Sequence, residues 1–120
     1  MVLDLKIDVK KEENIPVIIL NGEVDIYTYP KLSEALDKVI KDGSQSMILN
    51  LEKVNYMDST GLGAIAAGAN KLSQFGGHMN IICNQPQVKK IFKVSGLMKK
   101  NLSIFDEKDE ALAKAKQKTK

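Results

Sequence analysis

Short apolar runs alternate with amphipathic segments along most of this chain, and that alternation restricts the fold more than any other feature. Residues 16–20, 47–51 and 80–83 are mostly apolar runs of strand length. Apolar residues at helical spacing lie between them, first at Leu32, Ala35, Leu36, Val39 and Ile40. This order is typical of an α/β fold in which crossover helices connect parallel strands.

The chain opens with apolar residues that alternate with charged ones: Leu3, Leu5, Ile7 and Val9. A period of two predicts a strand with one wet face near a sheet edge. It pairs as a hairpin with residues 16–20 through a polar turn at 10–14, and Asn21-Gly22 ends the second strand.

Further signals predict where the remaining elements lie. Helices begin near Pro30, after Asp58-Ser59, at Pro86 and at Asp106 as N-cap, and residues 102–105 form a last strand. We therefore expect one α/β domain over residues 1–120, with a mixed, mostly parallel sheet opened by a hairpin and about four helices mainly on one side. Its core spans about residues 3–106, and residues 107–120 form a helix whose lysine-rich tail suits the helix dipole.

Composition excludes several classes of function. Cys83 and His78 are the only cysteine and histidine, so a disulfide within the chain, a cysteine-rich zinc site and most histidine-based catalysis are excluded. No run resembles a membrane helix or a signal peptide, which predicts an intracellular protein. All 18 cationic residues are lysine, and the six aromatic residues are not interleaved with them, which disfavours direct nucleic-acid binding despite the net charge of +3.

The densest candidate site is the stretch 56–63, between a predicted strand and a predicted helix. Ser59 lies there at a helix N-terminus beside Asp58, and this pattern fits an ordinary cap as well as a functional site. A phosphate-binding loop would need a lysine after the glycines, and a hydrolase elbow would need a glycine in place of Met57. Two roles remain: Asp58 as a phosphoacceptor helped by Asp25, or Ser59 as a hydroxyl that another protein modifies.

A second candidate stretch, residues 21–30, is polar and aromatic and follows a predicted buried strand. If the strands are parallel, it lies at the same sheet edge as Ser59. It fits a plain loop with a cap as well as it fits a binding surface.

At these two stretches the sequence resembles the bacterial anti-sigma factor antagonists of the STAS-domain family. The resemblance rests on residues 22–28 with Pro30, followed by residues 56–63, and continues through Gly96-Leu97, so that it covers roughly residues 3–106. It implies a STAS-type fold and a switch that is not an enzyme.

The resemblance also implies partners and site residues. In the family, the unphosphorylated antagonist binds an anti-sigma factor that is also a serine kinase, and so releases a sigma factor. The kinase phosphorylates the motif serine, here Ser59, and a PP2C-type phosphatase restores it. By position, the partner-binding residues are Asp25, Tyr27, Thr28, Asp58, Thr60, Gly61, Leu62 and Gly63. The implied protein is cytoplasmic, uses no cofactor or metal, contacts no membrane, and is a monomer or weak dimer.

Two alternatives stay open. A STAS scaffold or transporter-associated module would bind its partner without phosphorylation, although such modules need no hydroxyl at Ser59. A phospho-aspartate receiver would use Asp58 and a divalent cation.

Overall fold

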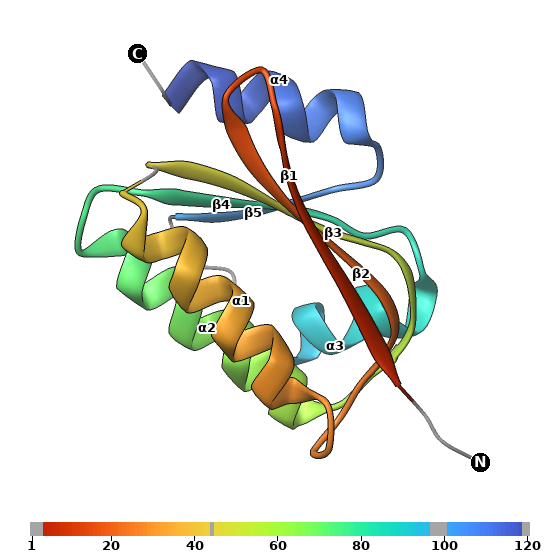
Figure 1. Ribbon diagram of the computed structural model, residues 1–120. Coiled ribbons are helices and arrows are strands. Elements are labelled where there is room, and N and C mark those ends of the chain that lie inside the picture. Colours follow the sequence, from red (N-terminus) through yellow and green to blue (C-terminus); the bar gives the residue numbers. More distant parts are fainter. Residues whose placement is uncertain (1–3, 44, 97–100, 119–120) are drawn as a thin grey trace.

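A five-stranded sheet with helices on both faces forms the protein (Figure 1). The computed structural model describes residues 4–43, 45–96 and 101–118, so Leu3, Leu97 and Lys120 lie outside the described residues. The strands follow chain order across the sheet: β1 (Leu5–Glu12), β2 (Ile15–Val24), β3 (Ser46–Met57), β4 (His78–Ile82) and β5 (Leu102–Phe105). Only β1 and β2 are antiparallel, which confirms the predicted mixed sheet opened by a hairpin.

The helices divide unequally between the two faces of the sheet. They are α1 (Tyr29–Lys41), α2 (Ser59–Ser73), α3 (Pro86–Ser95) and α4 (Lys108–Lys118). The first three cover one face over the larger apolar core, and α4 covers the other face over a smaller one (Figure 1). The larger core includes Ile18, Leu49 and Ile81, and the smaller includes Val17, Ile48 and Ile82, because side chains alternate along each strand. None of the described helices is long and apolar enough to cross a bilayer.

The hairpin turn is tighter than the sequence pattern predicted. Glu12 pairs with Ile15, so the turn consists of Glu13 and Asn14 alone, with φ angles of 50° and 69°. Two positive φ values are typical of a type I′ turn, whose twist matches that of the strands it joins. The predicted turn at residues 10–14 was therefore too long, because charged residues continue β1 on the exposed sheet edge.

Both central strands also extend beyond their apolar runs. β2 continues past Asn21-Gly22 to Val24, and β3 continues past Leu51 to Met57. Gly22 has a φ of +133°, and a Cβ there would lie 2.3 Å from the carbonyl oxygen of Asp4. The predicted strand ends were wrong because the pairing of β2 with β3 continues through polar residues as far as buried Val24 and Met57.

The start of α4 also differs from prediction. The helix begins at Lys108, and the carbonyl of Glu107 accepts a hydrogen bond from the Ala111 N–H at 3.3 Å. Asp106 is therefore not the N-cap. Its carboxylate forms an ion pair with Lys89 of α3 instead, which the local sequence does not reveal.

Candidate functional site

The two candidate stretches meet where β2 and β3 end. These strands are parallel, Val24 lies opposite Met57, and the Asp58 N–H donates to the carbonyl oxygen of Val24 at 3.1 Å. Helices α1 and α2 both start at this edge (Figure 1). The structure thus confirms that residues 21–30 and Ser59 share one sheet edge.

Asp58 caps α2 with a single carboxylate oxygen. Its Oδ1 accepts hydrogen bonds from the N–H groups of Thr60 and Gly61 at 3.0 and 3.2 Å, and from the Thr60 hydroxyl at 2.5 Å. Burial alone would raise the pKa of Asp58, but the bonds from the Thr60 hydroxyl and the two N–H groups outweigh burial and lower the pKa. Asp58 is therefore held ionised as a helix cap, the structural role that its position in the sequence suggested.

Ser59 and Thr60 are adjacent, but their hydroxyls differ in availability. Ser59 is the first residue of α2 and is exposed to solvent. No described residue hydrogen-bonds its hydroxyl, whereas the Thr60 hydroxyl is half-buried and donates to Asp58. Only the Ser59 hydroxyl is free to meet a second protein without disturbing the cap.

The loop before α1 is organised by Asp25 and Thr28. Asp25 Oδ1 accepts from the N–H groups of Tyr27 and Thr28 at 2.9 and 3.0 Å, and the Asp25 N–H donates to the Thr28 hydroxyl oxygen at 2.9 Å. The Thr28 hydroxyl donates in turn to the carbonyl of Glu23 at 2.8 Å. Asp25 is therefore committed to its own loop, and the buried Thr28 acts by shaping that loop rather than by exposing a side chain.

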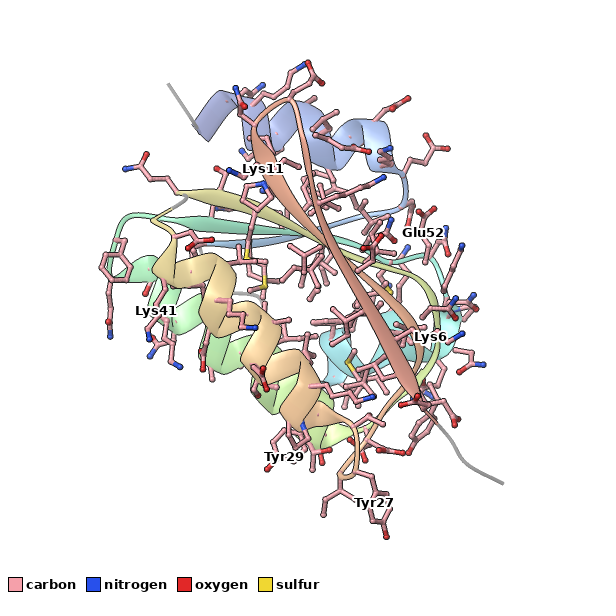
Figure 2. The ribbon with its side chains drawn as sticks, viewed as in Figure 1. Lys6, Lys11, Tyr27, Tyr29, Lys41 and Glu52 are labelled. Carbon is pink, nitrogen blue, oxygen red and sulfur yellow. The ribbon has the colours of Figure 1, made fainter. Side chains whose placement is uncertain are left out.

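Large apolar side chains project from this edge into solvent. Tyr27 is 87% exposed, Ile26 60% and Tyr56 42%. Tyr29 is 36% exposed, and Figure 2 shows Tyr27 and Tyr29 at the N-terminal end of α1. We call Ile26, Tyr27, Tyr29 and Tyr56 the aromatic rim. Several large exposed apolar side chains at one sheet edge are typical of an interaction site.

The glycines of the α2 motif differ in environment. A Cβ on buried Gly61 would lie 2.5 Å from Val24 Cγ1 and 3.0 Å from Met57 Cγ, so only glycine lets α2 start this close to the sheet. Gly63 is exposed, with nothing within 4 Å of an added Cβ, and Leu62 is buried. Gly61 and Leu62 therefore place the helix, while Gly63 lies open to solvent.

Sequence reasoning missed one residue that shapes this edge and two that are exposed on it. The side-chain amide of Gln87 in α3 brackets the end of β3, since its Oε1 accepts from the Met57 N–H at 3.2 Å and its Nε2 donates to the Met57 carbonyl at 3.0 Å. No local signal marks Gln87, because its partner lies 30 residues away. Ile26 and Tyr56 belong to the two candidate stretches, but the sequence does not show that their side chains are exposed rather than buried in the core.

The geometry gives no support to a phospho-aspartate receiver. The carboxylates of Asp58 and Asp25 are engaged by their own loops. Among residues 4–43, 45–96 and 101–118, no group of three or more histidine, cysteine, aspartate or glutamate side chains is placed to hold a metal ion.

Comparison with known proteins agrees with this arrangement. The family model for the STAS domain matches residues 6–111. An anti-sigma-B factor antagonist of Staphylococcus aureus is 33% identical over 95 residues, which are 79% of this chain and 88% of the relative.

Solved structures show the same fold. An anti-sigma factor antagonist from Mycobacterium paratuberculosis superposes with a TM-score of 0.85 at 25% identity, covering 93% of this chain and 94% of the other. The Bacillus cell fate determinant SpoIIAA in its phosphorylated form gives a TM-score of 0.69 at 23% identity, covering 91% and 98%. The chain therefore belongs to the STAS-domain family of bacterial anti-sigma factor antagonists.

Proposed function

We propose that this protein is an anti-sigma factor antagonist that is switched by phosphorylation of Ser59. The unphosphorylated form binds an anti-sigma factor that is also a serine kinase, and binding releases a sigma factor for transcription. The kinase phosphorylates Ser59, and a PP2C-type phosphatase restores the free hydroxyl. The observation that carries the proposal is a free, exposed hydroxyl at the start of α2, at the same sheet edge as the aromatic rim. The name of the S. aureus relative supports the anti-sigma factor as the partner.

The aromatic rim supplies the binding surface. Tyrosine side chains lose little conformational entropy on binding and are frequent hot spots in protein interfaces. Tyr27 and Ile26 project from a loop that Asp25 and Thr28 hold in place, so little ordering is needed when a partner binds. Exposed Gly63 leaves room for a partner to approach the first turn of α2.

Phosphorylation would block this surface without unfolding the domain. A phosphoserine carries a charge of about −1.5 to −2. The dipole of α2 favours negative charge at its first residue, so the helix tolerates the group. Asp58 already occupies the N–H groups of Thr60 and Gly61 and is itself negative, so the phosphoryl group is directed outward, toward the partner. Another protein of this fold is known in a phosphorylated form.

The same geometry selects Ser59 over Thr60 as the acceptor. The Thr60 hydroxyl donates to Asp58 at 2.5 Å, and phosphorylation would replace that donor with a second negative group. The cap would be lost at the same step. The Ser59 hydroxyl has no such commitment among the described residues.

The experiment is affinity capture from the native bacterium, with tagged wild type, Ser59→Ala and Ser59→Asp compared by quantitative mass spectrometry. Wild type and Ser59→Ala should recover the same anti-sigma factor kinase, and Ser59→Asp should lose it. Tyr27→Ala should weaken capture, whereas Phe75→Ala should not, because Phe75 is exposed but follows the C-terminal end of α2.

Retention of the partner by Ser59→Asp would contradict the switch and favour a STAS scaffold that is never phosphorylated. Because sigma factors act with RNA polymerase, we expect the protein in the cytoplasm.

A further inference from the structure

The first strand leaves one edge of the sheet open. Within the described residues β1 pairs with β2 alone, and β1 is eight residues long. Val9 is 50% exposed and Ile7 is half-buried. An open strand of this length presents unpaired N–H and C=O groups that a further strand can meet.

The hairpin turn determines which backbone groups point outward. A two-residue turn is closed by a hydrogen-bonded pair, here Glu12 and Ile15. Hydrogen-bonded pairs then alternate along the ladder, so the odd-numbered residues Leu5, Ile7 and Val9 turn their N–H and C=O groups to the open edge. The hydrogen bonds of Leu5 agree with this alternation, because neither is made to β2. Its N–H donates to the Asp4 side chain at 2.8 Å, and its carbonyl accepts from Lys31 at 3.4 Å.

We propose that two copies of this protein form a symmetric dimer by antiparallel pairing of their β1 strands, with Ile7 opposite Ile7 of the second copy. In that register Leu5 lies opposite Val9, and both have outward-facing backbone groups. The backbone groups of Leu5 would exchange their bonds to Asp4 and Lys31 for bonds to Val9 of the second copy. Lys6 lies opposite Asp8 in the non-hydrogen-bonded positions, where side chains approach most closely. Asp4 and Lys10 are the next opposite charges, and within one copy Asp4 pairs with Lys31 and Lys10 with Glu12. This inference concerns a surface other than the Ser59 edge and does not depend on the proposed function.

Other registers that preserve the backbone hydrogen bonds fit less well. Moving the centre of symmetry from Ile7 to Lys6 places Lys6 against itself, and moving it to Asp8 places Asp8 against itself. Like charges directly opposite one another are unfavourable. Centring on Val9 restores opposite charges but places Ile7 against Lys11. Among the registers centred on residues 6 to 9, the Ile7 register alone matches charges and apolar side chains together.

A groove beside β1 supports a second copy as the occupant. It has a volume of about 890 Å³, lies between β1 and α1, and is lined in part by Ile7, Val9, Ala35 and Val39. The rest of the lining is charged and includes Lys31, Glu34 and Lys38. Paired residues in a sheet direct their side chains to the same face, so Ile7 and Val9 of the second copy would lie next to the apolar part of the groove. Pairing would therefore bury apolar surface that a single copy exposes.

Sedimentation velocity over a concentration series of the full chain tests the dimer. Wild type should show a monomer–dimer equilibrium, and Lys6→Glu should raise the dissociation constant about tenfold, since it converts two attractive pairs into two repulsive ones. Asp8→Lys should act likewise. The double variant Lys6→Glu with Asp8→Lys should restore wild-type association, because the pairs are then reversed rather than lost. Lys90→Glu is the control, since Lys90 is exposed on α3 and does not line the groove beside β1.

Three results would overturn the proposal: a wild type that stays monomeric up to about 1 mM, single variants that associate normally, or a double variant that does not recover. Hydrogen exchange gives a readout independent of the variants. The amides of Ile7 and Val9 should become protected as concentration rises, while those of Asp8 and Lys10 are protected throughout. Uniform protection changes along β1 would contradict the assigned phase.

Discussion

Replacing Gly61 by alanine should destabilise the protein, although alanine is the better helix former. The new Cβ would lie 2.5 Å from Val24 Cγ1, about 1 Å closer than an ordinary carbon–carbon contact. Val24 is fully buried and β-branched, so its side chain has no other rotamer to adopt cheaply and α2 must move outward instead. Overpacking of this kind costs about 1–3 kcal/mol, against a gain of up to about 1 kcal/mol in helix propensity.

Gly63→Ala is the matched control, because it makes the same chemical change two residues away in open space. It should stabilise the protein by about 0.5–1 kcal/mol. The two variants should therefore differ by about 2 kcal/mol, which corresponds to urea midpoints roughly 1 M apart for a domain of this size. Urea unfolding followed by circular dichroism measures this difference. Equal midpoints for Gly61→Ala and Gly63→Ala would refute the claim that close packing against Val24 holds α2 at the sheet edge.

Further predictions concern the Asp58 cap of α2 and the hydrogen bonds between Gln87 and Met57. Asp58→Ala should lower the free energy of unfolding by about 1 kcal/mol, whereas Asp58→Asn should keep most of the stability that the cap contributes. Urea unfolding at neutral pH measures both. The folded-state pKa of Asp58 is lowered, so the stability that its charge adds depends on pH. The difference in free energy of unfolding between wild type and Asp58→Asn should be complete above about pH 5 and disappear as the pH falls through the lowered pKa. A difference that grows with acidity would contradict the hydrogen bonds to Asp58. Gln87→Ala should lower the free energy of unfolding by about 1 kcal/mol and speed hydrogen exchange at the Met57 amide. Unchanged exchange there would show that Gln87 does not bond Met57 in solution.

Much of the fold could be predicted because the hydrophobic periodicity and the positions of proline and turn residues indicate the same helices and strands. The alternation of Leu5, Ile7 and Val9 with charged residues identified the edge strand. Pro30 and Pro86 lie within the first turns of α1 and α3, as a proline without an N–H to donate should. The shared edge of residues 21–30 and Ser59 followed from parallel strands alone.

The remaining features depend on contacts between distant residues. The polar end of β3 is a strand because β2 runs beside it and Gln87 brackets Met57, and neither partner is local. Asp106 has the composition of a cap but pairs with Lys89. Tyr56 follows a strand pattern, and only the structure shows that its side chain reaches solvent.

Peptide mass spectrometry of the protein purified from its own cells, in growth and under stress, tests the central claim most directly. The account predicts a phosphoryl group on Ser59 whose occupancy changes with condition, and none on Thr60, whose hydroxyl is held by Asp58. An unmodified Ser59 in every condition, with a partner still bound, would contradict the phosphorylation switch. Phosphate on Thr60 alone would contradict the assignment of the acceptor.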